Sequence, residues 1–179
     1  RAVLPAFGND PLGDANPPGI MRSLVYNRPF QFIQAPDKIV MLIEWAHFWR
    51  DIWTDGRKVP ADPDPRWYGY SVGHWEGDTL VVNTVGLDSR AWLDEWGTPF
   101  SDEAKVEERW HRVNRDNLEL TITVTDPKYY TKTWTSDKRT YRLQPKTSPD
   151  GELLEVIFAP IDEQEFNRRI RNPAAGIKD

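Results

Sequence analysis

Three histidines, His47, His74 and His111, are the residues of this sequence most suited to metal binding or proton transfer. A zinc site would need all three to converge from different strands with a fourth position open to water, and their spacing does not require this. His47 alternates with Trp49 and Asp51 on one face of a predicted strand, so a neighbouring carboxylate could fix its tautomer for acid–base catalysis. We therefore predict that His47 is catalytic and that there is no metal site. A surface or packed histidine is the alternative.

Arg50, Glu108 and Arg109 are charged residues that fall within predicted strands rather than at turns. A charged side chain that points into a barrel must be paired. An internal glutamate–arginine pair could orient a substrate oxygen, which would make Glu108 catalytic and the arginines substrate-binding. An ion pair on the outer face of the barrel is the alternative.

Hydroxyl and carboxyl groups offer further candidates. Tyr70 and Ser71 carry hydroxyls on one strand, but the sequence has no G-x-S-x-G elbow that would activate a serine nucleophile. Asp94 lies between Trp92 and Trp96 on a connection that could close over a site. We predict Tyr70 and Asp94 as further catalytic residues. The sequence has no phosphate loop, dinucleotide fingerprint or EF-hand, so we predict no cofactor.

The nine tryptophans exceed what one core of this size can hold, so some are expected to line a groove or cavity. The alternative is that they are core anchors. The residues that we predict to bind a substrate are Trp49, Arg50, Ser71, Trp75, Trp92, Arg109, Tyr130 and Trp134.

The element most able to position such residues is the stretch YGYSVGHWEGDTLVVNTV, residues 68–85, which predicts two strands joined by a turn at residues 76–78. Its first strand alternates large residues with Gly69, Ser71 and Gly73. Glycine weakens a strand unless another backbone, a bulge or a ligand approaches closely. We therefore expect something large, a neighbouring side chain or a ligand, against the small-residue face.

The remaining hydrophobic pattern predicts an all-β fold, an antiparallel meander of about eight or nine strands. A lipocalin-like up-and-down barrel is favoured, because closure removes exposed edges, and a β-sandwich is the alternative. Residues 44–53 also fit a helix, but aromatic and β-branched content favours a strand for residues 46–53. Other predicted strands cover residues 30–34, 38–45, 105–113, 118–125, 129–144 (one long or two short) and 152–159.

The predicted organisation has three parts: an extended N-terminal arm (1–22), a single β-barrel domain (23–160), and a short C-terminal helix with a tail (161–179). A lid-like connection follows residue 86, where Ser89 could cap a short helical turn.

The net charge of -5 and the pI near 5.3 argue against a nucleic-acid partner. Zero cysteines exclude disulfides and a cysteine nucleophile, and no apolar run reaches the ~18 residues of a membrane span.

Four segments, EWAHFWRDIWTDGR, DPDPRWYGYSVGHWEGDTLVVNTVGL, WLDEWGTPFSD and EERWHRVNRDNLELTITVTDPKYYTKTW, resemble in that order a large uncharacterised family of bacterial, often exported proteins. The resemblance covers residues 30–134 and implies a single domain in a periplasmic or secreted protein. Relatives often have histidines where this chain has Tyr70, Phe100 and Lys105. If those histidines form a site in relatives, this chain has replaced most of it and retains His47.

The combined prediction is an exported small-molecule enzyme without a redox cofactor, of lyase, isomerase, cyclase or hydrolase type. It would hold an apolar or aromatic substrate in an aromatic-lined barrel. The alternatives are a non-catalytic binding module for a glycan or lipophilic ligand, and a structural or partner-binding domain. The expected partner is a small molecule, with no nucleic acid and no membrane, and a homodimer is possible.

Overall fold

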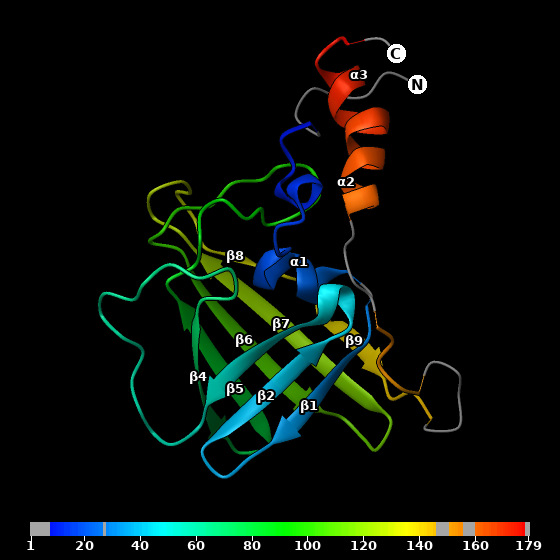
Figure 1. Cartoon of the computed structure of the whole chain (residues 1–179). Coiled ribbons are helices and arrows are strands. Elements are labelled where there is room, and N and C mark those ends of the chain that lie inside the picture. The colour runs from blue at the N-terminus through cyan, green and yellow to red at the C-terminus, as the bar shows by residue number, and fades with distance from the viewer. Residues whose placement is uncertain (1–7, 27, 146–150, 156–159, 178–179) are drawn as a thin grey trace.

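The structure is a computed structural model that describes residues 8–26, 28–145, 151–155 and 160–177. Its strands form one curled nine-stranded sheet in the order β1-β2-β3-β4-β5-β6-β7-β8, and β9 also pairs with β7 (Figure 1). The strands are β1 (Phe30–Gln34), β2 (Lys38–Ile43), β3 (Phe48–Trp53), β4 (Tyr70–Glu76), β5 (Thr79–Val85), β6 (Lys105–Arg112), β7 (Asn117–Thr125), β8 (Trp134–Thr135) and β9 (Arg139–Arg142). The all-β, barrel-like prediction is confirmed.

The barrel is half closed. Within the described ranges, no strand pairing joins β1 to β8 or β9, so the sheet has two free edges. The rings of Phe30 in β1 and Tyr141 in β9 nevertheless meet edge to face with centroids 5.0 Å apart. Side-chain packing therefore brings the two ends of the sheet together where backbone pairing does not. One curled sheet also replaces the two sheets of the alternative β-sandwich prediction.

The predicted antiparallel meander is wrong at one joint, because β3 and β4 pair in parallel through Ile52 with Ser71 and Trp53 with Val72. A parallel neighbour requires the chain to return to the end of the sheet from which β3 started. The proline-containing loop of residues 54–69 makes that return, so it runs along the length of the sheet. The other neighbouring strands pair antiparallel, including the predicted β4–β5 hairpin.

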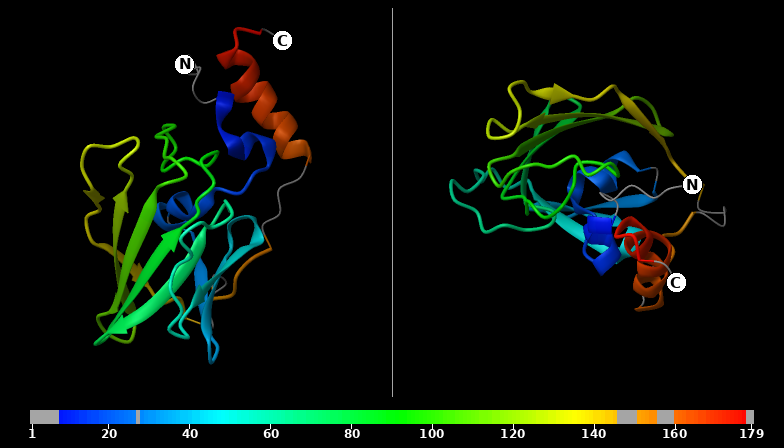
Figure 2. Two further views of the ribbon diagram at one scale, coloured as in Figure 1. Left: turned by 90° about the vertical axis from the view of Figure 1, so that its left-hand side faces the viewer. Right: turned by 90° about the horizontal axis from the view of Figure 1, so that it is seen from above.

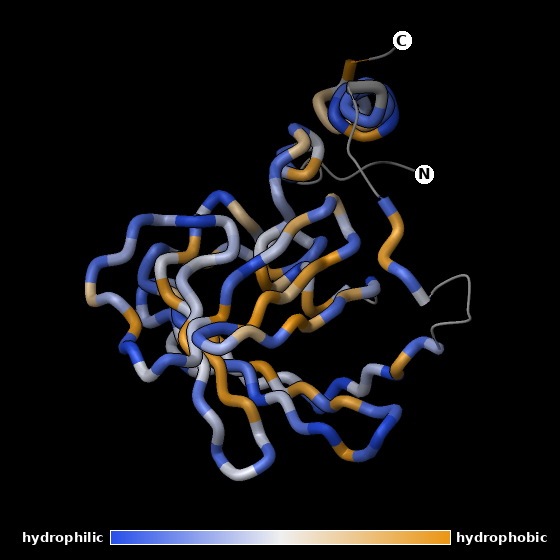
Figure 3. Tube along the Cα trace, turned by 60° about the horizontal axis from the view of Figure 1, so that its bottom comes forward, coloured by the Kyte–Doolittle hydropathy of each residue, from blue (hydrophilic) through white to orange (hydrophobic). Residues whose placement is uncertain are grey.

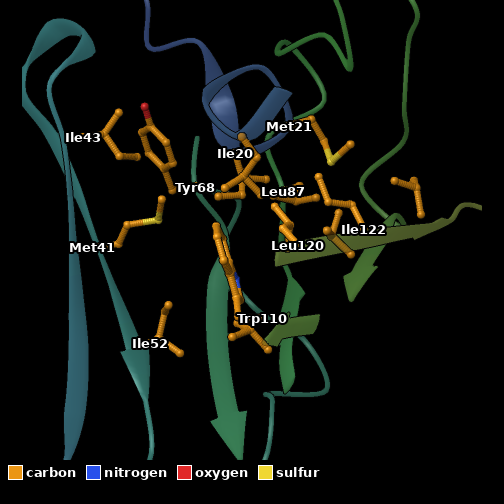
Figure 4. Close-up of a cluster of buried hydrophobic side chains, with 14 of the residues drawn as sticks. Ile20, Met21, Met41, Ile43, Ile52, Tyr68, Leu87, Trp110, Leu120 and Ile122 are labelled. Carbon is orange, nitrogen blue, oxygen red and sulfur yellow. The ribbon is translucent and has the colours of Figure 1, made fainter. Parts of the chain in front are cut away.

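A buried helix, α1 (Gly19–Val25), lies inside the curve of the sheet (Figure 2). This differs from the extended arm predicted for residues 1–22. Ile20, Met21 and Leu24 are at most 3% exposed and pack against the strands, as Figure 4 shows for the first two. Their i, i+1, i+4 spacing forms one helical face, and the prolines before Gly19 do not interfere because they precede the first hydrogen-bonded turn.

Alternation along the strands builds the core around α1. Met41, Ile52, Trp110 and Leu120 point inward from four strands (Figure 4), and hydrophobic and hydrophilic residues alternate along the chain of the sheet (Figure 3). The strands predicted at residues 105–113 and 118–125 are confirmed as β6 and β7, in which buried and more exposed positions follow the two-residue period of a half-buried strand.

The small residues of β4 face this core and not a ligand. A methyl group at Gly73 would lie 2.9 Å from Ile52 Cγ2 and 3.2 Å from Leu80 Cδ1. Gly69 has a φ of +64°, and a methyl group there would lie 2.6 Å from Thr84 Cγ2. Core aliphatic side chains therefore occupy the space for which a large neighbour was predicted.

Gly73→Ala is expected to lower the free energy of unfolding by about 1–3 kcal/mol, because an added methyl group overpacks a filled core. Urea unfolding followed by tryptophan fluorescence measures the change. Gly56→Ala is not a suitable control because Gly56 has a positive φ. Thr79→Ala, at a half-exposed position of β5, should change stability much less. An unchanged stability in Gly73→Ala would mean that this face has free space.

Connections and the C-terminus show further differences. The connection between β5 and β6 has no helical turn after Ser89, because Asp88 and Asp94 accept hydrogen bonds from nearby backbone N–H groups and so favour local turns. Residues 151–155 form no strand, and the rest of the strand predicted for residues 152–159 lies outside the described residues. The predicted C-terminal helix is confirmed as α2 (Pro160–Phe166), continued by η4 (Asn167–Arg171) and α3 (Asn172–Ala174).

The C-terminal helix stands apart from the sheet, beside the 3-10 helix η2 (Pro11–Asp14) (Figure 1). The Phe166 ring fills the space next to Gly13, and Arg171 forms an ion pair of 2.8 Å with Asp14. Another 3-10 turn, η3 (Trp45–His47), connects β2 to β3, so the strand predicted from residue 46 begins at Phe48. From there to Trp53 the strand prediction is confirmed over the helix.

Candidate functional site

The principal hollow of interest is a groove of about 1040 Å³ between α1, the connection before β6, and the chain from residue 130 to residue 141. Met21, Val25, Leu93 and Val124 give it an apolar floor. Its volume is at the upper end of the ~300–1,000 Å³ that is usual for small-molecule pockets. The groove is therefore large enough to hold a ligand of drug size or larger.

Aromatic side chains and hydroxyl groups form the sides of the groove. Tyr130, Trp134 and Tyr141 line it, and the Trp134 residue is 51% exposed. The hydroxyl of Tyr130 donates to the carbonyl of Pro99, which ties the two walls together. Burial raises the pKa of the Tyr130 hydroxyl, and the nearby Asp126 carboxylate adds to this effect. Tyr130 is therefore neutral at physiological pH and acts as a hydrogen-bonding wall.

Asp94 is the one predicted catalytic residue that lines the groove. Its Oδ1 accepts hydrogen bonds from the backbone N–H groups of Trp96 at 2.8 Å and Thr98 at 3.1 Å, and its Oδ2 accepts one from the Thr98 hydroxyl. Burial raises the pKa of Asp94, but these hydrogen bonds outweigh it, so the net pKa lies below the ordinary value. Asp94 is consequently an ionised carboxylate that holds the loop in shape.

The predicted glutamate–arginine pair exists, and it lies inside the core. Arg50 donates two hydrogen bonds to Glu108, of 2.8 and 2.6 Å, and Trp110 Nε1 donates a third at 2.9 Å. The Glu108 residue is 0% exposed and Arg50 is 4% exposed. Neither residue lines the groove, so this pair links β3 to β6 across the interior and has no access to a ligand in the groove.

His47 and Tyr70 lie elsewhere on the surface. His47 is exposed and has a φ of +55°, because it ends the η3 turn instead of belonging to the strand face that carries Trp49 and Asp51. The Tyr70 hydroxyl accepts a 3.1 Å hydrogen bond from Arg57, whose guanidinium stacks 3.6 Å from the ring centroid of Trp53. The structure therefore does not bring His47, Tyr70 and Glu108 to one cavity.

The predicted substrate-binding residues are likewise divided. Tyr130 and Trp134 line the groove. Ser71 is buried and shares a 2.9 Å hydrogen bond with the Thr84 hydroxyl, while Arg109 pairs with Glu76 on the outer face. Trp49 is 65% and Trp75 53% exposed, both away from the groove. The Trp92 ring lies over Gly97, with Arg22 5.9 Å from its centroid.

Several groove residues were missed by the sequence predictions. Met21 and Val25 belong to α1, and their helical spacing with Ile20 and Leu24 was the signal that could have identified them. Arg139 and Thr140, in β9, face the groove from its other side. No sequence signal marks these two, because their position depends on how β9 and α1 meet.

Two other features of the described chain limit its chemistry. Within residues 8–26, 28–145, 151–155 and 160–177, no three His, Asp or Glu side chains are grouped so that they could hold a metal ion. In the same ranges, no helix is long and apolar enough to cross a membrane.

Comparison of the chain with protein-family models, with curated proteins and with solved structures found no match. The resemblance to a family of exported bacterial proteins therefore stays a prediction, and the chemistry of the groove carries the functional argument.

Proposed function

We propose that this chain is a binding module for a lipophilic small molecule that lies in the groove between α1 and the β8–β9 edge. The observation that carries the proposal is the combination of an aliphatic floor with a half-exposed tryptophan on the same hollow. An apolar ligand would bury surface that the protein leaves open to water, which is favourable by about 25 cal/mol for each Å². Trp134 would add a stacking surface.

The aliphatic floor favours a lipophilic ligand over a glycan. Sugar rings need several polar groups arranged for hydrogen bonding around an aromatic platform. Here Asp94 already accepts three hydrogen bonds from its own loop, and the hydroxyls of Tyr130 and Tyr141 donate to backbone carbonyls. Few buried polar groups of the groove therefore remain to recognise sugar hydroxyls.

Catalysis is the second candidate, and it has less support. Of the four predicted catalytic residues, Asp94 alone lines the groove, and its carboxylate is engaged by Thr98 and Trp96. An enzyme of the lyase, isomerase or hydrolase type would need a general acid or base that reaches the ligand. Mass spectrometry of ligand recovered after incubation distinguishes the two functions: a binding module returns it unchanged, and an enzyme does not.

Binding is tested by titration with N-phenyl-1-naphthylamine, a neutral apolar probe whose fluorescence rises in a dry environment. We expect saturable binding, and we expect Trp134→Ala to weaken it about tenfold, which corresponds to ~1.4 kcal/mol of lost aromatic contact. Trp49→Ala is the matched control, because Trp49 is 65% exposed and lies outside the groove. Non-saturable binding, or equal weakening in both variants, would contradict the proposal.

A further inference from the structure

Arg139 differs from the other shielded arginines of the chain. Five arginines of the described ranges are buried or half-buried, namely Arg22, Arg50, Arg109, Arg139 and Arg171. Four of them have a carboxylate partner: Asp10 at 2.7 Å, Glu108 at 2.6 Å, Glu76 at 2.5 Å and Asp14 at 2.8 Å, respectively. Arg139 has no carboxylate within 4.0 Å among the residues that the structure describes, although it lines the groove.

The environment of Arg139 supplies neutral acceptors and no carboxylate among the described residues. Its Nη2 donates to the carbonyl of Val25 at the C-terminal end of α1, and its guanidinium also interacts with the Tyr141 hydroxyl, so part of its five N–H donors is used. The contact with Val25 satisfies a helix-end carbonyl but supplies no formal negative charge. A guanidinium half-shielded from water gains most from a bidentate oxyanion partner, and the chain provides none here.

The charges of the groove are separated along its length. Trp134 pairs with Val124 and Arg139 pairs with Leu120, so their backbone positions are about 13 Å apart along β7 at 3.3 Å per residue. Asp94 lies close enough to Tyr130 to add to the rise that burial causes in the pKa of its hydroxyl, and its own carboxylate is held by Trp96 and Thr98. Lys132 and Asp137 are exposed, and Lys138 pairs with Glu119 at 2.9 Å, so Arg139 is the one cation lining the groove that is half-shielded from water in the described ranges. The Arg139 end is therefore the end suited to a negative group.

We propose that Arg139 binds the oxyanion head group of an anionic amphiphile whose apolar chain lies on the groove floor toward Trp134. This inference rests on the proposed function and adds the charge and the orientation of the ligand. The separation of Arg139 from Trp134 matches a ligand with one charged end and an apolar body of about 13 Å. A chain of about twelve carbons carrying a carboxylate is the simplest molecule of this kind.

Dodecanoate and 1-dodecanol are matched probes, because they share an apolar chain and differ in charge at pH 8. Each is used, below its micellar concentration, to displace N-phenyl-1-naphthylamine from the protein. We expect dodecanoate to bind about tenfold more tightly than dodecanol, since a carboxylate forms a charge-assisted hydrogen bond with a guanidinium that is stronger than the bond of a neutral hydroxyl. The preference should weaken as salt is added.

Variants of Arg139 assign the preference to this side chain. Arg139→Gln is expected to lower dodecanoate affinity about tenfold to the level of dodecanol and to leave dodecanol affinity unchanged, whereas Arg139→Lys should retain part of the preference. Arg142→Gln is the control, because Arg142 is exposed on the same strand.

The outcomes separate the two proposals. Equal affinity of the unaltered protein for dodecanoate and dodecanol, or a preference that persists in Arg139→Gln, would overturn the role of Arg139. If dodecanol displaces N-phenyl-1-naphthylamine in either case, the proposal that the groove binds a lipophilic molecule is still supported. Failure of the probe and of dodecanol to bind would instead overturn the proposed function itself.

Discussion

Glu108→Ala is expected to lower the free energy of unfolding by about 3–5 kcal/mol, the largest effect of any single change considered. The substitution leaves the Arg50 guanidinium, 4% exposed, without a counter-charge inside the sheet. It also removes the acceptor of Trp110 Nε1, and Arg50 Nε already has no hydrogen-bond partner in the structure. The loss comes from an unpaired buried charge and from the three donors that lose their acceptor, rather than from the intrinsic strength of the pair.

Urea unfolding measures this effect, and two further variants identify its origin. Glu107→Ala is the matched control, because the Glu107 side chain is 41% exposed and lies 3.7 Å from Arg109 on the outer face. Exposed pairs of this kind contribute only about 0–1 kcal/mol. The double change Arg50→Met with Glu108→Leu removes both charges and should recover most of the stability. A loss below about 1 kcal/mol in Glu108→Ala would show that water or another group reaches Arg50.

Leu24→Ala is expected to lower the free energy of unfolding by about 2–5 kcal/mol, because it removes three carbon atoms from a filled space in α1. Leu24 is 1% exposed, and α1 is enclosed by the curl of the sheet (Figure 2). The neighbouring backbone is fixed from the other side, because the Tyr141 hydroxyl donates to the Leu24 carbonyl at 2.6 Å. The site therefore has little freedom to collapse around the cavity.

Thermal and urea unfolding of Leu24→Ala are compared with those of Leu143→Ala, in which the substituted residue is 56% exposed. The control should change stability by less than about 0.5 kcal/mol, as is usual for surface positions. The comparison also decides between two descriptions of the N-terminal region. If the N-terminal region were an arm on the surface, Leu24→Ala would lower the stability no more than Leu143→Ala does. If it is a core helix, Leu24→Ala lowers the stability far more.

The strands and their faces could be predicted because they depend on short-range pattern. Alternation in β7 indicated that Leu120 and Ile122 face inward, where the structure has them, whereas for β6 it separated two faces without deciding which one is buried. Charge in a strand likewise indicated that Glu108 needs a partner. The helix α1 was missed, since the proline- and glycine-rich residues before it dominated the local signal.

The candidate site was less predictable because it depends on contacts between distant segments. Asp94, Tyr130 and Trp134 were predicted and do line the groove, whereas Arg50 and Glu108 were predicted for their charge and proved to pair inside the core. His47 was placed on a strand face by alternation, but β3 begins one residue later, at Phe48. A shift of one residue moves a side chain to another surface.

Sequence alone determined the all-β class, most of the strands and their inward faces, because hydrophobic alternation and turn residues act over a few neighbouring positions. Tertiary structure decided the parallel joint between β3 and β4, the burial of α1 and the groove that α1 forms with β8 and β9. These features arise where segments that are not neighbours in the sequence meet, as when Tyr141 donates to the Leu24 carbonyl, 117 residues away. No local pattern encodes such a contact, since it is fixed by how the whole sheet curls.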